Sequence, residues 1–407
     1  MSFTTFVLHP DLLAGVRALG FSAPTPIQRD AIPPALAGRD VLACAMTGSG
    51  KTAAFLLPTM ARLRAPRRGV IRALVLAPTR ELAAQIDEHR RRLGAPGRFT
   101  GATIIGGVAP APQVEALRAG VDVLVATPGR LLDHLGQPHG RGRLQQLEVL
   151  VIDEADRMLD MGFLPDLRRL IAHVPVRRQT LLFSATMPPA ILALARDLLR
   201  DPVTIRVERA PAPATGITHS AYPVAAELKS RLLLALLARP DCRSVLAFTR
   251  TKHRANRLAE FLTGHGVATA RIHGNRSQPQ RTQALAGFKA GRFQVLVATD
   301  IAARGIDIHQ LSHVVNFDVP AAAEDYVHRV GRTARAEARG EALTLVAPEE
   351  ESDFRGIERA IGTRVPRVSV PGFDYAQRPA GRLEIPLRDR FAARAHRPAA
   401  PGRRPAR

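Results

Sequence analysis

Three carboxylates follow a run of branched apolar residues in the stretch VLVIDEAD at 149–156. They are Asp153, Glu154 and Asp156. Four apolar residues in a row, VLVI, are typical of a strand that is buried on both faces. Acidic side chains at the end of such a strand repel one another and lose hydration unless a cation holds them. The stretch therefore predicts carboxylates that serve a bound cation.

A glycine-rich stretch upstream, AMTGSGKT at 45–52, supplies groups that bind phosphate. It lies between a predicted strand, DVLACA, and a predicted helix, KTAAFLL. Glycines let backbone N–H groups point inward, a helix N-terminus adds partial positive charge, and Lys51 can reach phosphate oxygens. Ala45 stands where the common pattern has glycine, and a plain glycine-rich turn is the alternative. The predicted nucleotide-binding residues are Thr47, Gly48, Ser49, Gly50, Lys51 and Thr52.

The two stretches together predict a nucleotide bound with a metal ion. A carboxylate at a strand end, Asp153, can hold Mg²⁺ together with the hydroxyl of Thr52. Glu154 beside it can take a proton from an attacking water molecule, with Lys51 on the phosphates. An acidic strand end is also a common helix N-cap, but its pairing with a phosphate loop favours the metal and base roles.

The elements that must position these residues alternate between strand-like and helix-like patterns in both halves of the chain. RALVLAP and VDVLVAT are strand candidates, for example, and RELAAQIDEHRRRL is a helix candidate. This alternation predicts an α/β fold with parallel sheets that helices cover on both faces. The predicted divisions are a first domain at 1–207, a linker at 208–216, a second domain at 217–365, and a basic, disordered tail at 366–407.

The charge of the chain favours a polyanionic partner. Its 407 residues carry a formal net charge of +22, with a pI near 11.5, which favours nucleic acid first. A biased base composition would explain why Arg outnumbers Lys, but not the excess of positive charge. Trp is absent and only three Tyr occur, so we expect backbone contacts with little sequence preference rather than base stacking.

Other features of the sequence predict a cytoplasmic protein without membrane contact. MSFTTFVLHP lacks the pattern of a secretory signal. The longest apolar helical run, LLLALLA at 232–238, is far shorter than the ~20 residues of a membrane span. Cys44 and Cys242 are the only cysteines and lie far apart in sequence, so neither a disulfide framework nor a metal cluster is expected.

The sequence resembles the DEAD-box ATP-dependent RNA helicases. Residues 153–156 spell DEAD, and about ten motifs follow the family's order across residues 3–350. RMLDMGF after the DEAD residues and SFTTFVLHPDL at the start look most like the bacterial RhlE branch. The resemblance implies two tandem RecA-like domains, with the nucleotide site in the cleft between them and ATP and Mg²⁺ as cofactors.

By resemblance, GFSAPTPIQ at 20–28 recognises adenine. Gln28 would hydrogen-bond the edges of the base, and Phe3 would stack on it. Thr25 and Gln28 also form a capping-box pattern, with Pro26 at the first helical position. Both interpretations are compatible, because a cap would hold Gln28 in place.

Three loops of the first half resemble the family's contacts to the RNA sugar-phosphate backbone. PTRELA, GG and TPGR each follow a predicted strand, and their Arg, hydroxyl and backbone N–H groups suit phosphate oxygens. Each alone could be an ordinary strand-to-helix turn, so the prediction depends on all three. The implied RNA contacts are Arg80, Gly107, Thr127 and Arg130, with Thr299 and Gly305 in the second half.

Other motifs of the resemblance concern coupling and hydrolysis. SAT at 184–186 would relay between Asp156 and RNA through Ser184 and Thr186, although a plain strand-end cap is the alternative. HRVGRTAR at 328–335 would supply Arg332 and Arg335 as arginine fingers, although a basic run is by default a solvated helix face. His328 would bridge to the first domain, and Asp307 would bind the ribose.

Three departures from the family pattern stand out. Met46 replaces a Gln in the phosphate loop, which removes a polar side chain but no obvious ligand. Ala334 replaces a Gly, which is harmless in a helix but unfavourable where the backbone needs a positive φ. RAEARG follows where a turn with Gly is usual. We expect the last two departures to weaken domain closure and lower turnover without abolishing activity.

The sequence thus predicts an RNA-dependent ATPase that unwinds short duplexes locally. Its partner would be single-stranded RNA or a short duplex, in ribosomal or RNA-decay complexes, and the chain would be a monomer. Two alternatives stay open. One is an ATP-gated RNA clamp without productive unwinding, and the other is a DNA helicase, which a requirement for the 2′-hydroxyl would exclude.

Overall fold

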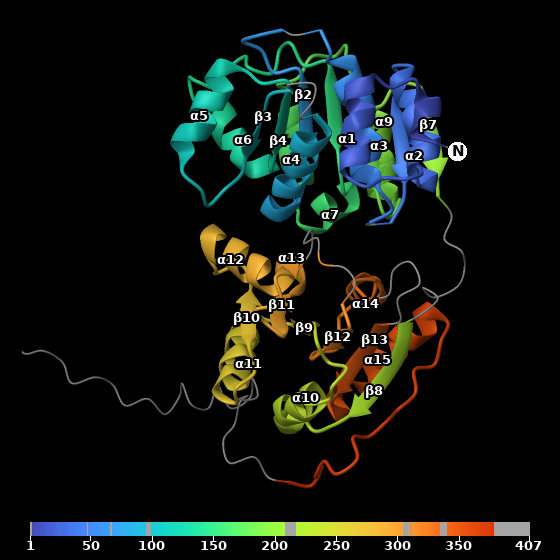
Figure 1. The fold of residues 1–407 in the computed structure, drawn as a ribbon, viewed down its shortest axis with the longest axis vertical. Helices are drawn as coiled ribbons and strands as arrows, with labels where there is room; N and C mark the ends of the chain where they lie inside the picture. The colour runs from blue at the N-terminus through green and yellow to red at the C-terminus, as the bar shows by residue number, and fades with distance from the viewer. Residues whose placement is uncertain are drawn as a thin grey trace, which may run out of the picture. The chain divides into compact units, whose positions relative to one another are not determined.

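The fold is seen in a computed structural model that describes most of the chain. The described residues are 2–46, 48–65, 67–94, 99–207, 217–303, 308, 311–333 and 340–377. They form two compact units on either side of residues 208–216, and each unit is described by itself (Figure 1). The predicted linker at 208–216 lies outside the described residues.

The first unit is built on a sheet of seven parallel strands in the order β3-β4-β2-β5-β6-β1-β7. The strands are β1 Val41–Cys44, β2 Ala73–Leu76, β3 Gly101–Ile104, β4 Val123–Ala126, β5 Val149–Ile152, β6 Gln179–Ser184 and β7 Val203–Arg206. Parallel neighbours need crossover connections, and the chain supplies them as helices. All the carboxyl ends therefore lie at one edge of the sheet.

Helices bury both faces of this sheet, as alternation along the strands shows. Odd-numbered residues such as Val149 and Val151 belong to one core cluster, and even-numbered Leu150 and Ile152 belong to another. The first cluster packs under α1 Pro10–Ala18, α2 Pro26–Leu36, α3 Lys51–Arg62 and α4 Arg80–Gly94. The second packs under α5 Pro110–Ala119, α6 Pro128–Leu135, α7 Ala155–Asp160, α8 Leu164–Ile171 and α9 Pro189–Leu198. Burial on both faces explains why the strands read as continuous apolar runs.

The second unit repeats this plan with six parallel strands in the order β10-β11-β9-β12-β13-β8. They are β8 Ile217–Pro223, β9 Val245–Thr249, β10 Thr269–Ile272, β11 Val295–Thr299, β12 His313–Asn316 and β13 Gly340–Val346. The helices are α10 Lys229–Leu237, α11 Lys252–Gly264, α12 Gln278–Lys289, α13 Asp300–Ala303, α14 Ala323–Val330 and α15 Glu351–Ile361. One core cluster contains α10 and α11, and another contains α14 and α15. The predicted α/β fold with two parallel sheets is confirmed.

The prediction of a disordered tail from residue 366 is wrong for residues 366–377. The Ala221 N–H donates to Pro366 O at 2.8 Å, and the Val368 N–H donates to Ala221 O at 2.8 Å. The segment thus pairs with the open edge of β8, which the sequence had not revealed as a strand. Its apolar side chains then pack on the core of the second unit. They are Val368, Val370, Phe373 and Tyr375.

A charged anchor fixes the same segment. Arg367 donates to the carboxylates of Glu351, at 2.8 Å, and Glu358, and its guanidinium lies 5.0 Å from the centre of the Phe354 ring. These contacts hold the pKa of Glu358 below its ordinary value, chiefly through the hydrogen bond from Arg367. Residues 366–377 are therefore part of the second unit, and residues 378–407 lie outside the described part of the chain.

None of the helices within the described ranges has the length and apolar character needed to cross a bilayer.

Candidate active site

The carboxyl edge of the first sheet separates the predicted motifs into two groups. The phosphate loop, the DEAD residues and SAT follow β1, β5 and β6, which are neighbours in the order β5-β6-β1. PTRELA, GG and TPGR follow β2, β3 and β4, which are neighbours in the order β3-β4-β2. Ligands of open α/β sheets bind outside the carboxyl ends of the strands. The topology thus places the motifs predicted to bind nucleotide on one half of the edge and the motifs predicted to contact RNA on the other.

The phosphate loop turns sharply into α3 at Gly50. Gly48 and Gly50 have φ values of 78° and 98°, in the left-handed region that favours glycine. A methyl group on Gly50 would also lie 2.5 Å from the Gln28 side-chain nitrogen. Both the backbone angle and the close approach of Gln28 therefore require glycine here. Thr47 lies outside the described residues.

Gln28 is buried, and its side chain forms hydrogen bonds with the backbone of Thr25 and of Gly50. The Thr25 N–H donates to its Oε1 at 3.0 Å, which is one half of the predicted capping box, and its Nε2 donates to Gly50 O at 3.0 Å. Thr25 Oγ1 is buried and makes no hydrogen bond within the described residues. The structure therefore brings Gln28 to the phosphate loop. Its contact with adenine stays a prediction.

Phe3 lies in the core instead of facing solvent. It is 3% exposed, and its ring stacks on Phe21 with centroids 6.3 Å apart and meets Phe6 edge-on at 5.9 Å. A ligand could stack on this ring only if the ring were uncovered. The geometry does not favour the adenine-stacking role predicted for Phe3.

Lys51 begins α3 and points back into the loop. Its ammonium donates to Ala45 O at 3.0 Å, and the side chain is buried. The Ser49 hydroxyl donates to Met46 O at 2.8 Å, whereas the Met46 side chain is exposed. Thr52 follows one residue into the helix and is half-buried. Lys51 is thus the buried cation of this loop, next to the predicted metal carboxylate.

Asp153 is a buried carboxyl group that lacks enough compensating charge. Burial raises its pKa to about 7, with a further upward contribution from Glu154, and the nearby Lys51 opposes the rise. Its Oδ1 accepts the Glu154 N–H at 2.9 Å. A divalent cation would relieve this cost, because it would favour the ionised form. The carboxylate of Asp153 and the hydroxyl of Thr52 are also oxygen donors of the kind that Mg²⁺ prefers, so these residues fit the predicted metal ion.

Glu154 occupies a strained backbone position at the end of β5. Its φ of 53° lies in the left-handed region, which costs a non-glycine residue roughly 1–2 kcal/mol. Its carboxylate forms an ion pair with Arg157 one turn along α7, and both side chains are largely buried. Strained positions of this kind occur often at functional sites. The ion pair with Arg157 was not predicted from the sequence.

Asp156 joins the DEAD residues to the SAT residues. Its Oδ2 accepts the Thr186 N–H at 2.8 Å, the Thr186 hydroxyl at 3.0 Å and the Ala185 N–H at 3.1 Å. Its own N–H donates to the Ser184 hydroxyl at 3.1 Å. The structure therefore brings together the three residues of the predicted relay. Whether they transmit a signal to RNA stays a prediction.

The predicted RNA contacts of the first unit also gather at the sheet edge. Arg80 begins α4, and its guanidinium lies so close to Gly107 that a side chain there would collide with it. Gly107 has a φ of 76°. Thr127 precedes α6 as its N-cap residue, and Arg130 lies in its first turn with a buried Nε that makes no hydrogen bond within the described residues. The structure brings Arg80 to Gly107.

The predicted residues of the second unit are only partly described. Thr299 ends β11, His328 is exposed on α14, and Arg332 is buried just after α14. Gly305, Asp307 and Arg335 lie outside the described residues.

A residue that the sequence did not reveal, Arg329, organises the carboxyl edge of the second sheet. Its guanidinium donates to both carboxylate oxygens of Asp300, at 2.6 and 2.7 Å, to Asn316 Oδ1 at 3.1 Å and to Asp318 O at 2.8 Å. It also lies over the Phe248 ring, 5.0 Å from the centroid. Arg329 thus ties the ends of β9, β11 and β12 to α14, which carries His328. The motif spacing alone could not separate it from the other arginines of HRVGRTAR.

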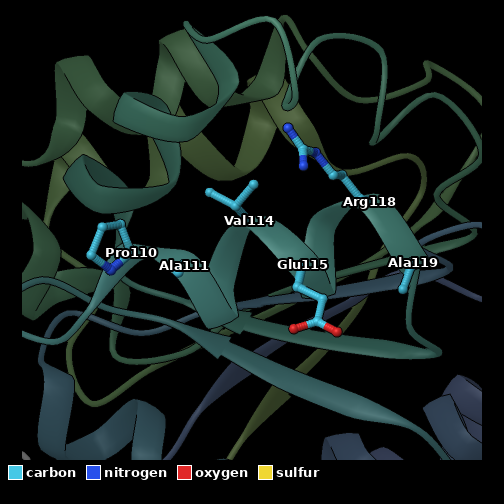
Figure 2. A pocket seen from close by; sticks show the side chains of 6 residues that line it. All are labelled: Pro110, Ala111, Val114, Glu115, Arg118 and Ala119. Atoms are coloured by element: carbon cyan, nitrogen blue, oxygen red, sulfur yellow. The ribbon is translucent and has the colours of Figure 1, made fainter.

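A shallow depression elsewhere in the first unit carries no convergent chemistry. It is lined by Pro110, Ala111, Val114, Glu115, Arg118 and Ala119, all on α5. Figure 2 shows the Glu115 and Arg118 side chains pointing in different directions. A single helix face with diverging charges does not resemble a catalytic site, so the strand-end groups described above are the candidate site.

Comparison with known proteins adds independent information on the family. Residues 25–194 match the family described as DEAD/DEAH box helicase, and residues 228–337 match the family described as Helicase conserved C-terminal domain. The chain is 40% identical over 384 residues to the DEAD-box ATP-dependent RNA helicase CshA of Geobacillus kaustophilus, which covers 94% of this chain and 82% of that protein. It is 41% identical over 376 residues to CshA of Bacillus subtilis, covering 92% and 76% of the two chains.

Solved structures agree with these matches. S. cerevisiae Dbp5 bound to RNA and ADP BeF3 aligns with a TM-score of 0.82 and 31% identity, over 90% of this chain and 95% of that one. A DEAD box protein from the hyperthermophile Methanococcus jannaschii aligns with a TM-score of 0.52 and 35% identity, over 91% and 99% of the two chains. With these matches and the strand-end motifs, the chain belongs to the DEAD/DEAH box helicase family.

Proposed function

We propose that this protein is an ATP-dependent RNA helicase, which hydrolyses ATP when RNA is bound and separates short RNA duplexes locally. One observation carries the proposal. The three nucleotide motifs end adjacent strands on one half of the sheet edge, and three RNA motifs end adjacent strands on the other half. The relatives named CshA and the Dbp5 structure with RNA and ADP BeF3 support the same activity and ligands.

In the nucleotide half, each residue has a distinct task. The N–H groups at the start of α3 and the Lys51 ammonium bind the phosphates; the ammonium has three N–H donors, and Ala45 O accepts one of them. Asp153 and Thr52 would hold Mg²⁺, which would neutralise phosphate charge when bound. Glu154 accepts the proton of the attacking water molecule. Gln28 would hydrogen-bond the adenine base and, through its bond to Gly50 O, hold the phosphate loop in position.

In the RNA half, Arg80, Gly107, Thr127 and Arg130 bind sugar and phosphate groups rather than base edges, so little sequence preference is expected. Asp156 connects the two halves, because it bonds Ser184 and Thr186 while its neighbour Glu154 serves hydrolysis. Thr299 and Gly305 add RNA contacts from the second unit. Arg332 and Arg335 supply positive charge to the transferred phosphate. Asp307 binds the ribose, and His328 would bridge to the first unit.

Finer features belong to the same proposal. We place the protein in the cytoplasm as a monomer, where ribosomal and RNA-decay complexes offer short structured RNA. The stretches SFTTFVLHPDL and RMLDMGF support the RhlE-like branch, whereas the curated relatives named above are CshA proteins. Ala334 and the stretch RAEARG support lower turnover than is usual for the family.

The experiment compares ATP turnover of the full chain with no nucleic acid, with single-stranded RNA, and with single-stranded DNA of the same sequence. We expect RNA to raise turnover at least tenfold and DNA to have little effect, since the 2′-hydroxyl is the group that distinguishes them. Strand displacement from a short RNA duplex should require ATP. Equal stimulation by DNA would favour a DNA helicase, and long-lived ATP-dependent RNA complexes without displacement would favour a clamp.

A further inference from the structure

A cluster of metal-binding side chains lies at the amino-terminal edge of the second sheet, away from the motifs. Asp241 and Cys242 lie just before β9, and His313 begins β12. One potential ligand atom of each residue lies within 4.8 Å of the others. Glu341, the second residue of β13, joins them, because its Oε2 lies 3.4 Å from His313 Nε2. Since β9, β12 and β13 are neighbours, the fold gathers groups that are far apart in sequence.

His313 is the unexplained member of this cluster. It is 2% exposed, and neither of its ring nitrogens makes a hydrogen bond within the described residues. Its Nε2 lies 3.4 Å from Glu341 Oε2 and 3.9 Å from Asp241 Oδ2. Neither contact has the geometry of a hydrogen bond. A buried imidazole is expected to have a partner. Burial lowers its pKa, and the neutral ring is the form that binds metals.

Charge favours a divalent cation at this place. Arg239 donates to Asp241, with Nη2 to Oδ2 at 2.6 Å, and to Glu341, with Nη2 to Oε2 at 3.2 Å. Two carboxylates therefore share one guanidinium, and each retains unused oxygen lone pairs. With Cys242 as a thiolate, Asp241 and Glu341 bring the negative charge to three, and Arg239 and a divalent ion together balance it. Solvent can reach the site through Asp241 and Glu341, which are partly exposed.

We propose that Cys242, His313, Asp241 and Glu341 form a binding site for a thiophilic divalent transition metal, Zn²⁺ first. A sulfur, an imidazole and carboxylates together suit Zn²⁺ better than Mg²⁺ or Ca²⁺. Tetrahedral Zn²⁺ needs its ligand atoms about 3.3–3.8 Å apart, from bond lengths of about 2.0–2.3 Å. The His313–Glu341 and His313–Asp241 separations are already close to this range. The Cys242 sulfur lies within 4.8 Å of a ligand atom of Asp241 and of His313, so it would have to move closer to them when the metal binds.

The metal serves the fold of the second unit rather than ATP chemistry. It joins the starts of three neighbouring strands, at the opposite edge from Thr249 and Thr299, which end β9 and β11. Because the Cys242 thiol must lose its proton to bind a metal ion, binding releases a proton and weakens at low pH.

The test titrates the full chain, without an affinity tag and after chelator treatment, with Co²⁺ in the absence of nucleotide. A bound thiolate gives a sulfur-to-cobalt charge-transfer absorption. His134 and His139 of the first unit, whose ring nitrogens Nδ1 and Nε2 lie 3.0 Å apart, contain no sulfur and could not produce it. We expect one equivalent of Co²⁺ per chain and displacement by Zn²⁺. Cys242→Ser should abolish the absorption, and Asp241→Asn should weaken affinity at least tenfold. Cys44→Ser, which changes the only other cysteine, should leave it intact.

Zn²⁺ should also raise the melting temperature of the wild-type chain, because a ligand that binds only the folded state stabilises it. Asp241→Asn should make that rise smaller at the same Zn²⁺ concentration. Absence of the charge-transfer absorption, or its persistence in Cys242→Ser, overturns the proposal. If Cys242→Ser does not fold, the exposed Asp241→Asn decides, and unchanged affinity in that variant also overturns it.

Discussion

At Glu154, the backbone and the side chain are both constrained. The residue has a φ of 53° and forms an ion pair with Arg157. The left-handed turn lets β5 end and α7 begin close together, so that Asp153 and Asp156 project from nearby points of the chain. The ion pair fixes where the Glu154 carboxylate lies. A base whose position is set before substrate binds has less reorganisation to undergo during reaction.

Replacing Glu154 with Gln should separate binding from hydrolysis. The amide keeps the size of the side chain but cannot accept the proton of water, so RNA-stimulated turnover should fall at least ~100-fold. Affinity for ATP should stay within about threefold of wild type. Nucleotide binding and turnover are measured side by side, with Glu115→Gln on the exposed face of α5 as the control. Near-normal turnover in the Gln variant would exclude Glu154 as the base.

Asp153 should give the first unit a measurable pH dependence of stability. Its folded-state pKa is raised to about 7, from an ordinary value of 3.8. Between these values the unfolded chain releases the proton while the folded chain keeps it. Its contribution to stability is therefore complete below about pH 4 and is lost as pH rises to about 7.

The variant Asp153→Asn tests whether the stability of the wild-type chain falls as pH rises. Asparagine stays neutral, so without nucleotide or metal the variant should melt several degrees above wild type at about pH 8, with a smaller difference at about pH 5. Thermal unfolding at the two values measures it. A difference that is equal at both values, or larger at low pH, would show that Asp153 is not a buried group with a raised pKa.

At the scale of elements, sequence patterns predicted the strands that lie inside the sheets. β2, β4 and β5 are continuous apolar runs because both of their faces are buried. β7 and β8, which lie at edges of their sheets, were missed because VTIR and ITHSAYP contain polar residues at exposed or half-exposed positions, which interrupt the apolar pattern. Segment 366–377 was missed for a related reason, since its pairing partner is β8.

The candidate site also contains residues that the sequence indicated and residues that it did not. The residue types at strand ends indicated the phosphate loop and the carboxylates, and the family resemblance supplied the partners of Asp156. Arg157 and Arg329 could not be recognised, because an arginine on a helix normally indicates a solvated face. Their roles depend on contacts across the fold, such as Arg329 with Asp300, which are 29 positions apart. The proposed metal site around His313 brings together residues at the starts of three neighbouring strands, and the spacing of the two cysteines in the sequence does not indicate this.

The turn into α3 should depend on Gly50 more than its backbone angle alone requires. Gly50→Ala places a methyl group against Gln28 in addition to a φ of 98°. Gly142→Ala is the matched control, because its φ is 72° but its Cβ meets nothing within 4 Å. Gly142→Ala should lose about 1 kcal/mol of stability from its backbone angle, and Gly50→Ala should lose more, because the contact with Gln28 adds to that cost. Only Gly50→Ala should also weaken ATP affinity, by at least tenfold, as measured by equilibrium binding. Equal ATP affinities in the two variants would refute the proposed link between Gln28 and the loop.

At the scale of the whole molecule, positive charge is concentrated beyond the described part of the second unit. Residues 378–407 contain nine arginines against Glu384 and Asp389, a net charge of +7. Residues 366–377, by contrast, contribute packing on β8 and the core. The two segments should therefore have different effects when they are removed.

Truncation after Gln377 should leave the melting temperature unchanged but weaken RNA affinity most at low salt. The salt dependence should flatten by ~0.7 in slope for each phosphate of a single strand that the tail neutralises in the full chain. Truncation after Val365 should in addition lower the melting temperature by several degrees, because it exposes the edge of β8 and removes the Arg367 anchor. RNA titrations across a salt series and thermal unfolding of both truncations measure these effects. Identical slopes for the full-length chain and the chain truncated after Gln377 would exclude the tail as an RNA-binding segment.

ATP turnover should need the arginines of HRVGRTAR as well as the phosphate loop and the DEAD residues. The most direct test measures RNA-stimulated turnover of the full chain with Arg335→Ala, at saturating ATP and RNA, with the exposed Arg177→Ala as control. We expect turnover to fall at least tenfold, about 1.4 kcal/mol of barrier, with ATP affinity nearly unchanged. Full turnover at saturating RNA, with only RNA affinity reduced, would exclude Arg335 from hydrolysis and make it a contact to the RNA backbone.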